Sequence, residues 1–117
     1  MNGPAKYGAL IYSNDINELA QFYIDLFSMR VTRKTNSLVS LVIDDFNIVI
    51  HTPPSIMPES DVNSVKLFIT VDNLENAKEK AIKLGGQAFD GVWSNPLFSV
   101  GNIADIDGNH IQIREFN

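Results

Sequence analysis

Ala104-Asp-Ile-Asp-Gly-Asn-His-Ile-Gln-Ile-Arg-Glu-Phe116 is the stretch of this chain that decides its fold. Asp107-Gly108 is a tight-turn signal, because glycine tolerates the positive φ that a hairpin-type turn requires. After the turn, apolar and polar residues alternate with the period of a strand that has two unlike faces: Ile111 and Ile113 against His110, Gln112 and Arg114. One face is expected to pack on apolar neighbours, and the other to carry polar groups toward a ligand.

The composition is that of an acidic globular chain without cysteine. The chain has 117 residues, of which 44% are hydrophobic, and a formal net charge of −5. A packed core is therefore expected, and wholesale disorder is not. The absence of cysteine excludes a disulfide framework, a zinc–thiolate site and a thiol nucleophile. The negative charge, with no basic cluster along the chain, argues against binding to duplex nucleic acid.

Neither a membrane span nor a targeting segment is expected. The longest apolar runs, such as Ser40–Ile43 with Ile48–Ile50, are too short to cross a bilayer. Met1–Ala5 lacks the charged and apolar regions of a signal peptide. We therefore expect a cytoplasmic protein that contacts neither a membrane nor nucleic acid.

Hydrophobic periodicity divides the chain into two similar halves. The first half is expected to form one helix and four strands: Tyr7–Tyr12, a helix from about Ile16 to Phe27, Met29–Arg33, Leu38–Ile43 and Phe46–His51. Ser13-Asn14-Asp15 offers N-cap residues for the helix. The segment Thr52–Asn63 holds three prolines and predicts a linker.

The second half repeats this order. Its expected elements are Lys66–Val71, a helix from about Leu74 to Leu84, Gln87–Phe89, Phe98–Ile103 and His110–Glu115. The sequence thus predicts an α+β domain of two tandem βαβββ modules, forming a cup-shaped mixed sheet with the helices outside. Module one is expected at about residues 5–52, the linker at about 53–64 and module two at about 65–117.

This organisation resembles the vicinal oxygen chelate superfamily, which includes glyoxalase I, extradiol dioxygenases, and bleomycin- and fosfomycin-resistance proteins. The order of elements, the Phe22-Tyr23 pair near the end of the first helix, and Asp105-Ile-Asp-Gly-Asn-His-Ile-Gln-Ile113 carry the resemblance. It covers nearly the whole chain. The resemblance implies the two-module fold and a homodimer, but not one activity, because members differ widely in chemistry on one scaffold.

The resemblance also implies where a metal would bind. The superfamily uses one residue from the first strand and one from the last strand of each half, mostly His and Glu. Matching places these positions at Gly8, His51, Lys66 and Gln112. Glycine has no donor atom and the lysine ammonium repels a divalent cation, whereas a catalytic zinc site typically has three protein ligands. We therefore expect that the metal site is lost and that no cofactor is bound.

Seven residues are predicted to bind a small-molecule ligand instead: His51, Lys66, Phe68, Trp93, Phe98, His110 and Gln112. Strand alternation places Lys66 and Phe68 on one face, opposite the aliphatic residues that should pack under the helices. Three of the seven have a plain structural alternative. His51 reads equally as an exposed strand-end histidine, Lys66 as a solvated lysine, and Trp93 as a core residue rather than a loop aromatic at the mouth of a pocket.

Other polar residues of the last hairpin are expected to have no direct role at the site. We expect Asp105 and Asp107 to serve the turn, and Arg114 to lie on the surface because strand ends often emerge into water.

Three functions remain open from the sequence. The leading hypothesis is a metal-independent binding protein of the bleomycin-resistance type, holding an aromatic or anionic ligand in the cleft. The second is a glyoxalase-like metal-dependent lyase or dioxygenase whose metal site is displaced. The third is a metal-free enzyme in which His51 acts as general base, since imidazole ionises near neutral pH.

Overall fold

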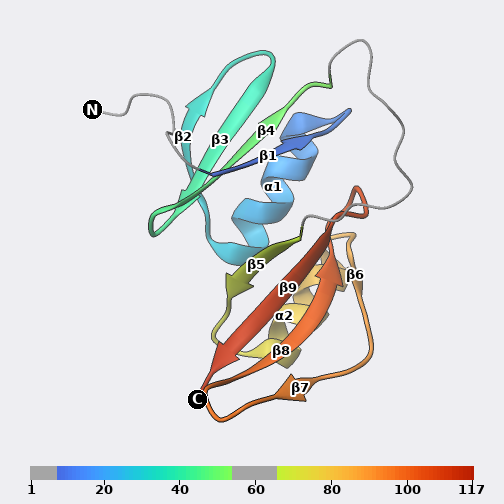
Figure 1. The fold of residues 1–117 in the computed structure, drawn as a ribbon. Helices are drawn as coiled ribbons and strands as arrows, with labels where there is room; N and C mark the ends of the chain where they lie inside the picture. The colour runs from blue at the N-terminus through green and yellow to red at the C-terminus, as the bar shows by residue number, and fades with distance from the viewer. Residues whose placement is uncertain (1–7, 54–65) are drawn as a thin grey trace. The chain divides into compact units, whose positions relative to one another are not determined.

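The structure, a computed structural model, describes residues 8–53 and 66–117 (Figure 1). The chain divides into two compact units, Met1–Ser60 and Asp61–Asn117. Within the described residues each unit contains one mixed sheet and one helix, which confirms the predicted α+β class and the tandem βαβββ order. Tyr7 and nearly all of the expected linker lie outside the described residues.

The described part of the first unit is a four-stranded sheet with one helix. Its elements are β1 (Ala9–Tyr12), α1 (Ile16–Phe27), β2 (Arg30–Lys34), β3 (Leu38–Ile43) and β4 (Phe46–His51). The strand order is β1-β4-β3-β2, with β1 parallel to β4 and the other neighbours antiparallel. Asp15 caps α1 by accepting a hydrogen bond from the Glu18 amide at 3.0 Å, as expected for an N-cap residue.

The second unit repeats this topology with one added strand. Its elements are β5 (Leu67–Thr70), α2 (Leu74–Lys83), β6 (Gln87–Ala88), β7 (Trp93–Ser94), β8 (Phe98–Ala104) and β9 (His110–Phe116). The order β5-β9-β8-β6 matches that of the first sheet, and the short strand β7 pairs with β8. Asn73 caps α2 through the Asn76 amide at 2.9 Å.

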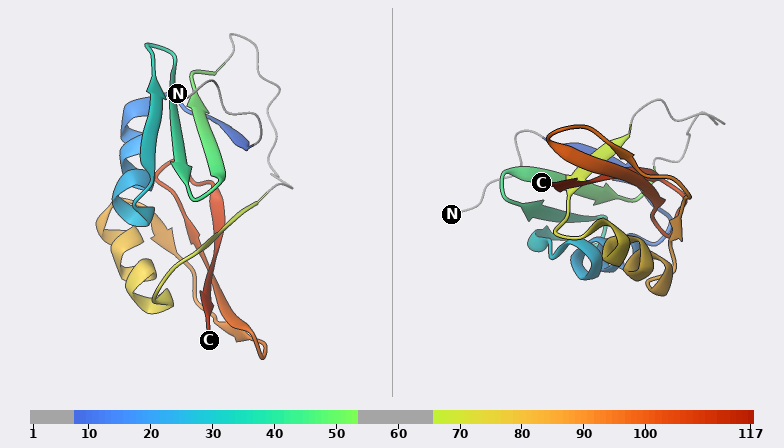
Figure 2. Two further views of the ribbon diagram at one scale, coloured as in Figure 1. Left: turned by 90° about the vertical axis from the view of Figure 1, so that its left-hand side faces the viewer. Right: turned by 90° about the horizontal axis from the view of Figure 1, so that it is seen from below.

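In each unit the helix covers one face of its own sheet (Figure 2). The sheet residues beneath the helix are fully buried and aliphatic, among them Ile48 and Ile50 in the first unit and Ile111 and Ile113 in the second. The residues that alternate with them lie on the other side, as the strand periodicity predicted. Each sheet therefore has a helix-covered face and an opposite face, which we call its open face.

Most element boundaries agree with the sequence within one or two residues, and one element was missed. Trp93-Ser94 was expected in a loop but forms β7, because its backbone pairs with Val100 and Ser99 of β8. Met29 was expected to begin a strand, but β2 starts at Arg30 and Met29 is buried in the core. Neither helix in the described part of the chain is long and apolar enough to span a membrane.

Candidate functional site

The open face of the second sheet gathers most of the predicted site residues. Alternation sends Phe68 outward, with 58% of its surface exposed, while its neighbour Ile69 is 5% exposed beneath the helix. In register across the sheet, Phe68 lies level with Gln112 and Asn102, and Thr70 lies level with Arg114 and Val100. Lys66, the residue before β5, reaches the same face through its contact with Asn102.

Arg114 lies at the centre of this face. Its guanidinium carbon is 4.0 Å from the centroid of the Phe68 ring and 5.0 Å from that of the Phe98 ring, both within the range of a cation–π interaction. Its Nε donates a hydrogen bond to Gln112 Oε1 at 2.8 Å. Arg114, which was expected on the surface, is half-buried on this face, where the two phenyl rings hold its side chain against the sheet. Its position on the Gln112 face was the sequence signal for this role.

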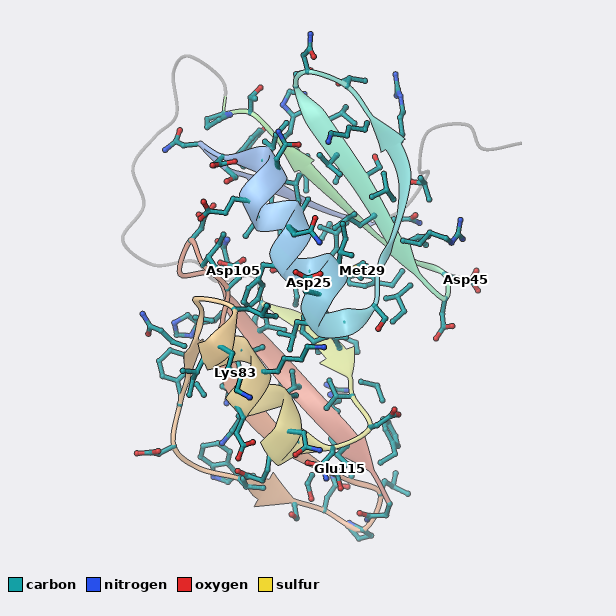
Figure 3. All side chains as sticks on the ribbon, turned by 180° about the vertical axis from the view of Figure 1, so that it is seen from behind. Asp25, Met29, Asp45, Lys83, Asp105 and Glu115 are labelled. Atoms are coloured by element: carbon teal, nitrogen blue, oxygen red, sulfur yellow. The ribbon has the colours of Figure 1, made fainter. Side chains whose placement is uncertain are left out.

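The open face of the second sheet carries positive charge. Lys66 Nζ donates to Asn102 Oδ1 at 3.0 Å. Within residues 8–53 and 66–117, neither Lys66 nor Arg114 forms an ion pair with a carboxylate. Glu115 alternates to the helix-covered face, where its Oε1 accepts a hydrogen bond from the Leu74 amide at 2.6 Å and caps α2 (Figure 3). Lys66 and Arg114 therefore lie on the open face of the second sheet, and no Asp or Glu is paired with Arg114 on the neighbouring strands.

Aromatic rings extend the face toward β7. Trp93 lies level with Val100 and is 59% exposed, so it is not a core residue. Phe98 packs against Phe116, with ring centroids 5.1 Å apart. Exposed rings of this kind offer flat surfaces on which a planar ligand can stack.

His110 lies on the same face as Gln112, nearer the turn that precedes β9. It is level with Ala104 in the sheet, and its ring lies 4.9 Å from that of Phe89, tilted by 30°. The structure thus brings Lys66, Phe68, Phe98 and Gln112 together around Arg114, and places Trp93 and His110 further out on the face.

His51, the seventh predicted residue, belongs to the first unit. It ends β4, level with Tyr12 and Leu38, and its Nδ1 lies 2.7 Å from the Thr52 carbonyl oxygen. Because a carbonyl can only accept, this contact places the ring proton on Nδ1 and leaves the Nε2 lone pair free in the neutral ring. The Tyr12 ring meets it edge to face at 6.4 Å.

Backbone hydrogen bonds identify the corresponding positions of the two units. The Ser13 amide donates to the His51 carbonyl at 3.0 Å, and the Val71 amide donates to the Arg114 carbonyl at 2.8 Å. His51 is therefore the counterpart of Arg114, and the counterpart of Gln112 is Val49, two residues earlier in β4.

The residues at the corresponding positions do not fit a metal ion. Gly8 and Val49 offer no donor atom in their side chains, and Lys66 carries a positive charge. A Cβ at Gly8 would collide with the Asn47 carbonyl oxygen, so the backbone leaves no room there for a ligating side chain. The described residues contain no group of three or more His, Asp or Glu that could hold an ion. Gln112 alone provides an oxygen donor, which is too few for a catalytic site.

Asp105 serves the turn before β9, as expected. Its side chain is 2% exposed, and its Oδ1 accepts hydrogen bonds from the amides of Asp107 at 3.0 Å and Asn109 at 2.9 Å. The Asn109 side chain adds bonds to both carboxylate oxygens. Gly108 has φ +88°, the positive value that the turn signal predicted.

Solved structures match this chain over nearly its whole length, whereas no family profile and no curated protein sequence matches it. A glyoxalase-related enzyme from Fulvimarina pelagi has a TM-score of 0.76 at 17% identity, over 94% of this chain and 87% of that chain. A glyoxalase/bleomycin resistance protein/dioxygenase family enzyme from Burkholderia phytofirmans has a TM-score of 0.82 at 15% identity, over 94% and 97%. Lactoylglutathione lyase from Agrobacterium tumefaciens has a TM-score of 0.67 at 17% identity, over 97% and 96%.

The chain therefore has the glyoxalase/bleomycin resistance/dioxygenase fold, which confirms the resemblance expected from its sequence. At these identities the likeness establishes the fold alone. The activity has to be argued from the side chains of this chain.

Proposed function

We propose that this chain is a metal-independent binding protein that holds a small aromatic or anionic molecule on the open face of the second sheet. The observation that carries the proposal is Arg114, whose guanidinium lies over Phe68 at 4.0 Å and over Phe98 at 5.0 Å without a carboxylate partner in the described chain. A planar, weakly hydrated guanidinium held in this way is suited to bind an anion. Lys66 adds a second cation on the same face.

The aromatic residues support the same proposal. Phe68 and Trp93 each leave more than half of their surface exposed on the same face as Arg114, where a flat ligand can stack on them. The donor set argues against a metal-dependent reaction at the corresponding positions, since Gly8, Val49 and Lys66 cannot ligate a cation.

Replacement of the two cations tests the proposal. A library of small aromatic acids would be screened by thermal shift, and the hits measured by isothermal titration calorimetry. Arg114→Gln and Lys66→Gln should each weaken binding by about tenfold or more, because a charge-assisted hydrogen bond contributes about 1.5–3 kcal/mol. Arg33→Gln, on exposed β2 of the first unit, and Lys83→Gln, at the exposed end of α2, are controls with the same change in charge. Equal losses in the controls would contradict a specific site.

Metal content separates this proposal from a glyoxalase-like lyase or dioxygenase. Tag-free protein would be analysed by plasma mass spectrometry before and after incubation with Ni²⁺, Zn²⁺, Fe²⁺ and Mn²⁺. We expect no stoichiometric retention of any of these ions. One tightly held ion per chain or per dimer would overturn the metal-independent proposal and favour a displaced metal site.

A metal-free enzyme that uses His51 as general base is a second candidate function. It is favoured by the Nδ1–Thr52 carbonyl contact, which leaves Nε2 as the nitrogen able to accept a proton. Should a turnover assay be found, His51→Ala should abolish activity and keep the fold. Full activity in that variant would exclude the role.

The homodimer implied by the family resemblance stays a prediction. Sedimentation equilibrium across a range of protein concentrations would test it, with a monomer mass at all concentrations as the contradicting result.

A further inference from the structure

We propose that the open face of the second sheet selects ligands by hydrogen-bond polarity, and that its ligand is a planar aromatic carboxylate whose polar groups are all acceptors. This inference rests on the proposed binding function and names the chemical class of the ligand.

The two cations fix the orientation of two amide side chains. Arginine and lysine can only donate hydrogen bonds. The bond from Arg114 Nε therefore holds the oxygen of Gln112 toward the guanidinium, and the bond from Lys66 Nζ holds the oxygen of Asn102 toward the ammonium. Each amide is left with its NH₂ group for other partners.

The four side chains consequently present mainly donors, because each amide oxygen already accepts from a cation and keeps one lone pair. Gln112 and Asn102 lie level with each other on neighbouring strands, and Arg114 is the next outward-facing residue of β9. Their remaining donors are the guanidinium N–H groups, the ammonium and the two amide NH₂ groups. Thr70, level with Arg114, adds a hydroxyl that can donate or accept. Carboxylate oxygens are acceptors only and gain most from charged donors.

The rings beside these donors define the rest of the ligand. Phe68 is level with Gln112 and largely exposed, and Trp93 lies three strands from Thr70, with Arg114 and Val100 on the two strands between them. A flat ring can lie against an exposed phenyl or indole while a carboxylate attached to its edge meets the donors between them. A ligand that carries N–H or ammonium groups at that edge would place donor against donor and lose the interaction.

Three benzenes with the same 1,3 substitution pattern test this inference directly. They are benzene-1,3-dicarboxylate, with acceptors only, benzene-1,3-dicarboxamide, with both kinds of group, and benzene-1,3-diamine, which is chiefly a donor. Isothermal titration calorimetry on the intact chain should show the dicarboxylate binding about tenfold or more tighter than the dicarboxamide, and the diamine weakest.

Variants distinguish a change at the proposed site from the same change in charge elsewhere on the chain. Gln112→Glu keeps the shape of the side chain but puts an acceptor and a negative charge beside Arg114, so dicarboxylate binding should fall by about tenfold or more. Asn17→Asp makes the same change in charge at an exposed position of α1 and should leave the affinity unchanged. Arg114→Lys keeps the charge but loses the planar fork and its bond to Gln112, and should also weaken binding. Circular dichroism and thermal midpoints establish that each variant is folded.

The outcomes separate this inference from the function on which it rests. Preference for the dicarboxylate, lost in Gln112→Glu and kept in Asn17→Asp, supports it. Equal or tighter binding of the dicarboxamide or the diamine overturns the polarity rule and leaves a binding protein with another ligand. If none of the three binds while the library gives hits, the ligand class is wrong. If neither the three benzenes nor any library compound binds, the proposed function is contradicted as well.

Discussion

The two sheets of this protein share one register and one kind of core, but they present different open faces. Beneath the helices, Ile48 and Ile50 of the first sheet correspond to Ile111 and Ile113 of the second, and all four are fully buried. On the other side, Val49 of the first sheet corresponds to Gln112, and His51 to Arg114. At these positions the residue type is preserved beneath the helices and differs on the open faces.

The difference shows which face carries chemistry specific to this chain. A helix-covered face must fill a fixed volume with apolar atoms, so its residue types are restricted. An open face has no such requirement, and its residues can diverge while the strands stay in register. On the open faces, Lys66 and Phe68 of the second unit correspond to Gly8 and Leu10 of the first.

The largest effects should come from the shared core. Ile50→Ala and Ile113→Ala each remove a fully buried side chain at corresponding positions, and each should lower the free energy of unfolding by about 2–5 kcal/mol. Urea unfolding followed by circular dichroism would measure both. A much smaller loss for one of the pair would break the correspondence between the two cores.

The hairpin that joins the last two strands of each unit gives the next largest effect. In the second unit, Asp105→Ala removes a buried acceptor of the Asp107 and Asn109 amides, which should cost about 2–3 kcal/mol because those donors lose their partner. The first unit joins β3 to β4 through the exposed pair Asp44-Asp45 (Figure 3). Asp45→Ala should therefore change stability by less than about 0.5 kcal/mol. Thermal unfolding of both variants checks the contrast, and comparable losses would contradict it.

A smaller effect is expected where the two cores differ. Gly101 of β8 is the counterpart of Val39, and a Cβ at Gly101 would stand 2.9 Å from Lys78 Cε and 3.1 Å from Leu74 Cδ2. In the second unit the aliphatic part of the buried Lys78 side chain thus lies beside Gly101, where a valine side chain would otherwise be. Lys78 Nζ donates a hydrogen bond to the Gly91 carbonyl at 3.1 Å. Gly101→Ala should lower the free energy of unfolding, measured in urea, by about 1–2 kcal/mol, because the added methyl group overpacks this site.

A double-mutant cycle with Lys78→Ala isolates that contact. The double variant should be more stable than the sum of the single losses predicts, by about 0.5 kcal/mol or more. Strict additivity would show that Lys78 does not cause the crowding at Gly101.

The fold was predictable from the sequence because its signals are local. Strand alternation, the helix caps at Asp15 and Asn73 and the turn at Asp107-Gly108 each depend on a few neighbouring residues. β7 was missed because Trp93-Ser94 is too short to show a period, and its pairing with β8 is a tertiary contact.

The site was predictable only in part. Alternation predicted that Phe68 and Gln112 face outward. The role of Arg114 depends on rings of two neighbouring strands: β5, which is far from β9 in the sequence, and β8, which runs antiparallel to it. The correspondence of His51 with Arg114 likewise follows from backbone hydrogen bonds that sequence matching does not contain. Val49 and His51 are two residues apart and face the same side of the strand, so alternation alone could not show which of them corresponds to Gln112.

The smallest effect on stability should come from exchanging the open faces. Val49→Gln in the first sheet and Gln112→Val in the second swap corresponding residues, and each should change the free energy of unfolding by less than about 1 kcal/mol, because neither side chain packs beneath a helix. Gln112→Val should nevertheless weaken anion binding, since Arg114 Nε loses its oxygen acceptor and the face loses an NH₂ donor. Urea unfolding and calorimetry on the same two variants separate the quantities. A loss of stability as large as that of Ile113→Ala would mean that the open face is part of the core, and that its polar residues were retained for packing rather than for a ligand.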